Sequence, residues 1–287
     1  MTSRFKDRLA NAAFAPPNCD GSFEPDFAAY LKDMGSTRPT VVLAFAPKAA
    51  GTFLRSACVG AVRGAFVRTV HAQGGRDASF YLPTFLLYYA GGFPSLPLVT
   101  HVHMQALPAN RHFMDTLGLK PVIMIRAIPD MLASYGDMLD RDPHSPDNWL
   151  NFRLPPQYAE LSPEAKCDFL IDMAGPWYAS YFATWMEYVA EAPERVLALE
   201  YEHFVADPAA TLEKLLVHSG MPQTRDTCQW ALDAVWEQRE EYRFNKGISG
   251  RGRSRFTRDQ IARLERQLDF YPNLAALKNK LIPPSAP

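Results

Sequence analysis

The sequence shows almost no imbalance of charge. Its 30 lysine and arginine residues face 31 aspartate and glutamate residues, which leaves a formal net charge of −1 at pH 7. Proteins that bind nucleic acid or an anionic membrane through their overall field carry a clear excess of positive charge. The balance therefore argues against both kinds of partner.

Cysteine is scarce, and long apolar runs are missing. The cysteines at 19, 58, 167 and 228 are far apart without a C-x-x-C pair, so neither a disulfide framework nor a cysteine metal site is expected. No apolar run reaches the roughly 18 residues that predict a membrane span. Residues 1–15 lack the apolar core of a secretory signal. We therefore expect a cytoplasmic protein without a bound metal.

Apolar residues are abundant, at 47% of the 287 residues, and this length is enough for one large α/β domain or two small ones. Strands alternate with helical patterns and predict a central, mostly parallel sheet flanked by helices, in a single domain spanning residues 1–287. We interpret residues 1–38 as a peripheral segment and the proline-rich residues 140–162 as a loop or lid. The predicted strands are 41–46, 66–70, 98–103, 121–126 and 195–201.

The first of these strands leads into a turn and a helix. Pro47 ends the strand, and from Gly51 the apolar residues recur at helical spacing. Such a segment directs backbone N–H groups and a helix dipole at one point, and Lys48 adds a full charge. It predicts an anion site, although a lysine in a βα turn is often merely solvated. It is not a Walker A loop, because its lysine precedes the only glycine.

Two later strands end in side chains that suggest a site. His101 and His103 fall on the same side of a strand if the period of two holds, which fits a ligand site at the sheet edge or satisfied core histidines. No third metal ligand lies nearby in the sequence. Arg126 ends a buried strand, where a guanidinium is costly unless it meets an anion. That anion is either a carboxylate or the phosphate of a ligand.

Aromatic and basic segments complete the pattern. The aromatic residues of 79–97 and 163–192 fit core packing, and they also fit the wall of a pocket for an apolar or aromatic acceptor. Residues 243–258 contain six basic residues, three glycines and no acid. In a chain of balanced charge, so local a basic segment favours a polyanionic ligand over a solvated loop.

The order Pro47-Lys48-x-x-Gly51-Thr52 resembles the first loop of the sulfotransferases that use 3′-phosphoadenosine 5′-phosphosulfate (PAPS). Four further segments resemble that family in the same order, and together the matches span residues 41–257. They are Thr100-His101; Arg126, Asp130 and Ser134 in an Arg-x-x-x-Asp-x-x-x-Ser frame; Tyr201-Glu202 with Asp207-Pro208; and Lys246-Gly247 with Gly250 in a Lys-Gly-x-x-Gly frame. The chain departs from the family at Ala50 (usually Gly), Phe53 (usually Trp) and Asn245 (usually Arg, for which Arg243 or Arg251 would substitute).

This resemblance implies a P-loop-like sulfotransferase fold and transfer of a sulfuryl group from PAPS to a hydroxyl or amine of a small-molecule acceptor, without a metal. Lys48 is the implied charge stabiliser, and His101, or else His103, is the implied general base. The implied nucleotide-binding residues are Lys48, Ala49, Ala50, Gly51, Thr52, Phe53, Arg126, Ser134, Tyr201, Lys246, Gly247 and Arg251. A phosphotransferase and a non-catalytic nucleotide-binding protein are the alternatives. Neither the acceptor nor the oligomeric state follows from the sequence.

Overall fold

Five parallel strands form the centre of the protein. The computed structural model describes residues 29, 31–33, 38–70, 79–81, 84–85, 96–141, 154–238 and 249–284. Within these residues the strands lie in the order β2-β3-β1-β4-β5, and every neighbouring pair is parallel. The strands are β1 (Thr40–Leu43), β2 (Ala65–Phe66), β3 (Leu98–His101), β4 (Pro121–Ile125) and β5 (Leu197–Glu200).

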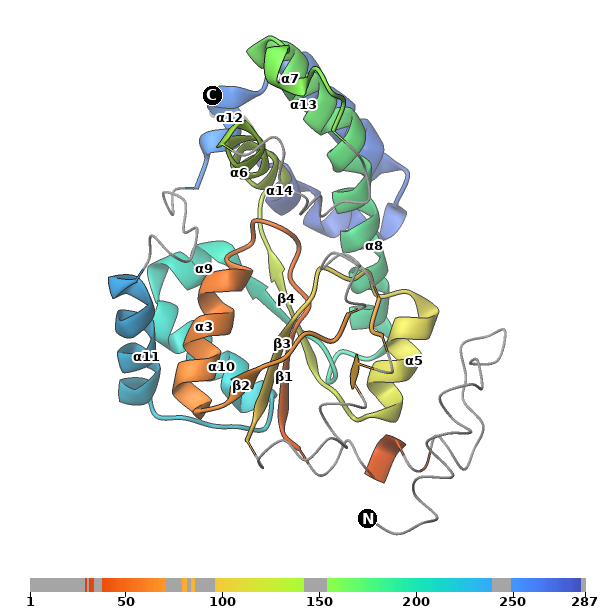
Figure 1. Ribbon diagram of the computed structural model, residues 1–287. Helices are drawn as coiled ribbons and strands as arrows, with labels where there is room; N and C mark the ends of the chain where they lie inside the picture. The colour runs from red at the N-terminus through yellow and green to blue at the C-terminus, as the bar shows by residue number, and fades with distance from the viewer. Residues whose placement is uncertain are drawn as a thin grey trace.

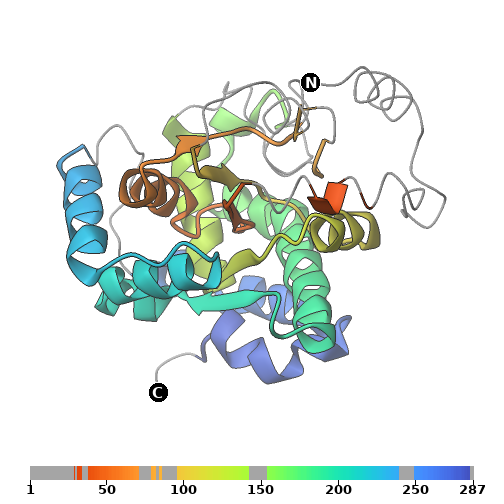
Figure 2. The ribbon, with the colours of Figure 1, turned by 90° about the horizontal axis from the view of Figure 1, so that it is seen from below.

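Helices cover both faces of this sheet, which confirms the predicted α/β fold class (Figure 1). Helices α3, α10 and α11 lie on one side, and α5 and α8 lie on the other, as the view from below also shows (Figure 2). The α-helices are α3 (Gly51–Val62), α5 (Pro108–Thr116), α6 (Ile128–Arg141), α7 (Pro163–Phe169), α8 (Gly175–Glu191), α9 (Tyr201–Ala206), α10 (Pro208–His218), α11 (Arg225–Glu237), α12 (Arg251–Arg255), α13 (Arg258–Asp269) and α14 (Lys278–Leu281).

The central strands are apolar because both of their faces are covered. All four residues of β1 and all five of β4 are buried, as expected for strands of a parallel sheet with helices on each side. Strand β1 pairs with β3 from Thr40 to Leu43, so its carboxyl end lies beside His101. The carboxyl ends of β1, β3 and β4 therefore meet at one edge, beneath α6, α12 and α13 (Figure 1).

Several predicted boundaries need correction. Strand β3 ends at His101 rather than at residue 103, and the short second strand is Ala65–Phe66 rather than 66–70. Strand β5 ends at Glu200, so Tyr201 begins a helix instead of ending the strand. Hydrogen bonding along a strand stops where the backbone turns away from its neighbour, which the side-chain pattern does not reveal.

The predicted loop at 140–162 is partly helical. Helix α6 continues to Arg141, and a 3₁₀ turn, η1, spans Tyr158–Glu160. Residues 142–153, and most of the predicted peripheral segment 1–38, lie outside the described residues, so the lid remains a prediction. The predicted break in the helical region 163–192 is a π-helical segment, η2 (Leu170–Ala174), between α7 and α8.

Buried aromatic residues of α8 confirm the core-packing interpretation of that helix. Tyr178, Tyr181, Phe182 and Trp185 are each 0% exposed. The indole of Trp185 donates a hydrogen bond to the carbonyl oxygen of Met104 at 3.0 Å, which fixes α8 to the chain that follows β3. None of the helices among the described residues has the length and apolar character needed to span a membrane.

Candidate functional site

A tight loop joins β1 to α3 and carries the predicted anion site. Lys48 and Ala50 both have left-handed backbone conformations, with φ of 66° and 64°, and Ala50 is the N-cap of α3. Non-glycine residues rarely adopt this conformation, which fits the glycine usual at the position of Ala50 in the loops that this sequence resembles. Left-handed turns of this kind direct successive N–H groups to one side. The loop thus has the backbone geometry of an anion site.

The loop leads directly into the amino-terminal end of α3. The amide of Ala49 closes a turn by donating to the carbonyl of Ala46 at 3.3 Å. The first N–H groups of a helix have no acceptor within the helix, and here they belong to the residues from Gly51 onward. Lys48 is half-buried beside them. Together these groups concentrate positive charge at the carboxyl end of β1.

The two histidines lie directly beside this loop. Their rings are perpendicular, with centroids 4.8 Å apart, and both are buried. The Nδ1 atom of His103 lies 2.6 Å from the carbonyl oxygen of Phe45. Because a carbonyl only accepts, His103 carries its proton on Nδ1. His103 therefore holds the loop backbone.

His101 lies against the first residue of α3. A Cβ atom built on Gly51 would lie only 2.1 Å from Nε2 of His101. The imidazole thus occupies the space that any side chain at residue 51 would fill, which explains the glycine in the Pro-Lys-x-x-Gly-Thr sequence. The loop, Lys48 and His101 are brought together at one point.

Replacing Gly51 by alanine is expected to lower the free energy of unfolding by about 1–3 kcal/mol, the usual cost of overpacking. The new methyl group would force the His101 ring out of place. Ala50→Gly is the matched control, since it alters the neighbouring residue but relieves a left-handed conformation, and we expect a change of about 1 kcal/mol or less. Chemical denaturation of both variants measures the difference. Equal stability of Gly51→Ala and the wild type would contradict the packing.

Arg126 connects the loop to Tyr201. It directly follows β4, is 8% exposed, and donates from Nη1 to the carbonyl oxygen of Lys48 at 2.5 Å. Its guanidinium carbon lies 3.8 Å from the ring centre of Tyr201, in a cation–π arrangement. Burial raises the pKa of Tyr201, while Arg126 opposes that rise. Arg126 therefore contacts two other predicted residues, Lys48 and Tyr201.

A buried guanidinium such as that of Arg126 needs an anion as partner, and among the described residues no carboxylate fills this role. In that part of the chain no ion pair involves Arg126, and its buried Nε atom has no hydrogen-bond partner. Of the two alternatives from the sequence, the carboxylate is therefore not found in this part of the chain. Ser134 is buried in the second turn of α6, on the same face as Asp130.

Asp130 anchors the end of the basic segment. Its two carboxylate oxygens accept hydrogen bonds from the backbone N–H groups of Gly250 and Gly252, each at 2.7 Å. A Cβ atom on Gly252 would lie 2.3 Å from the backbone carbon of Pro129, so α12 approaches α6 closely only because residue 252 is a glycine. The aspartate of the Arg-x-x-x-Asp-x-x-x-Ser frame thus fixes the last glycine of the Lys-Gly-x-x-Gly frame.

Arginines of α12 reinforce this anchor. Arg251 and Arg255 both form ion pairs with Asp137 of α6, each at 2.5 Å. The Arg251 guanidinium therefore holds α12 on α6, and its contact with a nucleotide remains a prediction. Lys246 and Gly247, together with the rest of residues 239–248, lie outside the described residues.

Aromatic side chains flank the start of α3. Phe53 is 5% exposed and contacts the rings of Phe204 and Trp236 edge-on, with centroids 6.0 and 6.4 Å away. Trp236 is 49% exposed and forms the outer edge of this cluster. The sequence alone does not single out Trp236, because one tryptophan in an amphipathic helix is normally a core residue. Its position shortly before the basic segment is the signal that points to it.

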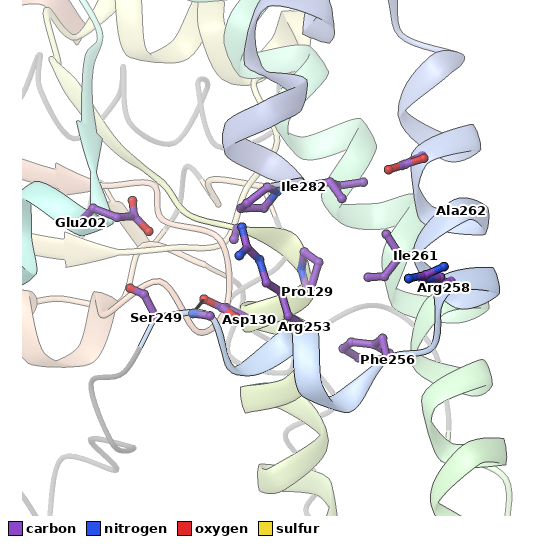
Figure 3. Close-up of a pocket in the computed structure, with 14 residues that line it drawn as sticks. Pro129, Asp130, Glu202, Ser249, Arg253, Phe256, Arg258, Ile261, Ala262 and Ile282 are labelled. Carbon is purple, nitrogen blue, oxygen red and sulfur yellow. Dashed lines mark hydrogen bonds between the residues drawn. The ribbon is translucent and has the colours of Figure 1, made fainter. Parts of the chain in front are cut away.

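A cavity of about 620 Å³ adjoins the anchor on α6 (Figure 3). Asp130 and Pro129 form part of its wall, and Glu202, Arg253 and Arg258 also line it. Lys48, His101 and Arg126 are not among the lining residues. The cavity is thus a neighbour of the loop site rather than a part of it. Among the described residues, no group of three or more His, Cys, Asp or Glu side chains could hold a metal ion.

This architecture is the fold of the sulfotransferases. The chain is similar to mouse sulfotransferase SULT7A1, solved in complex with PAP, with a TM-score of 0.59 and 14% identity over 87% of this chain and 90% of that one. Two structures of retinol dehydratase, one in complex with androsterone and inactive cofactor PAP and one with retinol and PAP, match with TM-scores of 0.49 and 0.47. They are 14% and 13% identical and cover 100% and 91% of this chain and 97% and 87% of theirs. No protein-family model and no curated protein matches the sequence.

Proposed function

We propose that the protein transfers a sulfuryl group from PAPS to a hydroxyl or amine of an apolar or aromatic small molecule. The observation that carries this proposal is the environment of Arg126. A buried guanidinium without a carboxylate partner among the described residues contacts the Lys48 loop on one side and Tyr201 on the other. This arrangement fits a ligand with several anionic groups, as the resemblance implies for PAPS.

The residues of the site divide between binding and chemistry. Arg126 and Ser134 bind the 3′-phosphate, together with the segment that contains Lys246, Gly247 and Arg251. Phe53 and Tyr201 pack on the adenine, with Trp236 as a further aromatic surface. Residues Ala49, Ala50, Gly51 and Thr52 form the loop around the 5′-phosphosulfate. No metal is required, because cations and amides already neutralise the leaving group.

His101 acts as the general base in this proposal. It takes the proton of the acceptor while the acceptor oxygen or nitrogen bonds to sulfur. The S–O bond to the nucleotide breaks at the same centre, and its electron pair leaves with adenosine 3′,5′-bisphosphate (PAP). Lys48 and the amides at the start of α3 stabilise the charge that develops on the bridging oxygen. His101 is preferred to His103 because it lies against Gly51, the first residue of α3. The Nδ1 proton of His103 is bound to Phe45, so Nε2 is the atom through which His103 would act if it were the base.

Calorimetry with PAP, followed by an assay with labelled PAPS and a panel of phenols, sterols, alcohols and amines, tests the proposal. Binding of PAP together with labelled product is the expected result. PAP binding without product would favour a non-catalytic nucleotide-binding protein, and phosphate transfer from ATP with Mg²⁺ would favour a phosphotransferase. Failure of folded protein to bind PAP would overturn the proposal.

Replacing Asp130 by alanine is expected to weaken PAP binding by at least about tenfold and to cost about 3 kcal/mol of stability, because two amides lose a charged acceptor. The control is Asp168→Ala, since Asp168 also accepts from two groups of α13, Gln260 and Arg263. That variant should lose stability and keep its affinity for PAP. If both variants bind PAP like the wild type, Asp130 does not position the basic segment.

A further inference from the structure

Two tyrosines of α8 donate hydrogen bonds to backbone carbonyls of the loop between β1 and α3. The hydroxyl of Tyr178 donates a hydrogen bond to the carbonyl oxygen of Pro47 at 3.0 Å, and the hydroxyl of Tyr181 donates to the carbonyl oxygen of Ala44. Residues three apart lie on the same face of a helix, so both hydroxyls point at the loop from one surface of α8. Both side chains are 0% exposed.

The other carbonyl groups of this loop are held as well. Phe45 accepts from Nδ1 of His103, Ala46 accepts from the amide of Ala49, and Lys48 accepts from Arg126. Every carbonyl from residue 44 to residue 48 therefore has a hydrogen-bond donor. Side chains from three other parts of the chain supply four of these donors.

The direction of these carbonyls determines what the loop can bind. The oxygen of a peptide group is its negative end, so a carbonyl that turned toward a bound anion would repel it. In a planar peptide group the N–H points away from the C=O, so a donor that fixes the carbonyl of Ala44 or Pro47 also fixes the direction of the next N–H along the chain. Preorganised dipoles of this kind stabilise charge without reorganising during a reaction.

We propose that Tyr178 and Tyr181 are positioning residues, which orient the peptide groups of the loop so that its amides face the sulfuryl group being transferred. This inference rests on the proposed function, and it identifies the side chains that support the loop of the same site. Neither tyrosine contacts the reacting atoms; each acts through the carbonyl that it binds.

The chemistry of the two side chains suits this role. Burial raises the pKa of Tyr181 well above its usual value, so the hydroxyl keeps the proton that it donates. The Tyr181 ring is stacked on Trp177, with centroids 5.3 Å apart and planes 17° apart, and it also packs against Trp185. Aromatic packing thus fixes the ring itself, and replacement by phenylalanine removes the hydroxyl without moving the ring.

The test compares Tyr178→Phe, Tyr181→Phe and the double variant with the control Tyr188→Phe. Tyr188 lies on the same helix, and its hydroxyl donates to Asp115, away from the loop. Hydrogen–deuterium exchange of residues 44–53, which needs no nucleotide, reports the order of the loop. Turnover of labelled PAPS, with KM and kcat determined separately, reports the chemistry, and thermal unfolding reports overall stability.

In each loop variant we expect faster hydrogen–deuterium exchange of residues 44–53 and a loss of at least about tenfold in kcat, with a larger loss in the double variant. The reason is that a carbonyl without its donor allows the peptide group to rotate. The control should change neither quantity. Loop variants that match the control in exchange and in kcat would overturn the inference. If the wild type does not use PAPS at all, the proposed function fails, and unchanged exchange in the variants would still refute the role of the tyrosines.

Discussion

Alanine in place of Lys48 is expected to lower the turnover of PAPS by more than about a hundredfold, the usual cost of removing a group that stabilises transition-state charge. The lysine lies in the loop between β1 and α3 with a left-handed backbone, half-buried beside the first amides of α3. Its side chain carries a full positive charge three residues before the first of those amides, that of Gly51. The substitution removes that charge at the point where the leaving oxygen becomes negative.

The backbone of this residue is held independently of its side chain, which makes the experiment specific. Arg126 donates to the carbonyl of Lys48, and that contact survives any substitution at residue 48. Lys48→Met is a useful companion, because it keeps the length of the side chain without the charge. Both variants should retain the stability of the wild type while losing kcat. Turnover within about tenfold of the wild type in both would exclude Lys48 from the chemistry.

His101→Ala is likewise expected to lower turnover by more than about a hundredfold, the scale of a lost general base. His101 lies against Gly51 at the start of α3, close to where the resemblance implies that the sulfuryl group binds. The variant should still bind PAP, because the base acts on the acceptor rather than on the nucleotide. Single-turnover assays with labelled PAPS, beside calorimetry with PAP, separate these two effects.

The neighbouring histidine provides the sharpest control. In His103→Asn the amide nitrogen can replace Nδ1 as a donor to Phe45, whereas no ring nitrogen remains to accept a proton. We therefore expect His103→Asn to keep far more activity than His103→Ala. If His101→Ala stays active while His103→Asn and His103→Ala are both inactive, His103 is the base and the assignment is wrong.

The sequence predicts the elements of this fold better than it predicts their contacts. The strand–turn–helix around Lys48 follows from a change of hydrophobic period between Pro47 and Gly51, and β1 and α3 confirm it. The end of β3 at His101 does not follow, because apolar side chains continue beyond the last paired residue. Local patterns therefore fix which elements form and leave their ends uncertain by a few residues.

Contacts between distant segments lie beyond such patterns. The strand before Arg126 predicts a buried guanidinium that needs an anion, yet its bond to the Lys48 carbonyl joins residues 78 apart in sequence. The aromatic pattern of α8 predicts a core helix, whereas the hydroxyl contacts of Tyr178 and Tyr181 depend on how that helix docks. The resemblance to sulfotransferases supplied candidate residues, and the tertiary structure brings Lys48, His101, Arg126 and Tyr201 to one sheet edge.

The hydrogen bonds between Asp130 and the amides of Gly250 and Gly252 have a consequence for folding during synthesis. These partners lie 120 and 122 residues further along the chain. When α6 leaves the ribosome, the carboxylate of Asp130 has been synthesised but the amides that it binds have not. The carboxylate therefore stays solvated until residues 250–252 have also been synthesised. Contacts of such long sequence separation form late and slowly. We therefore expect the docking of α12 on α6 to be among the last events in folding.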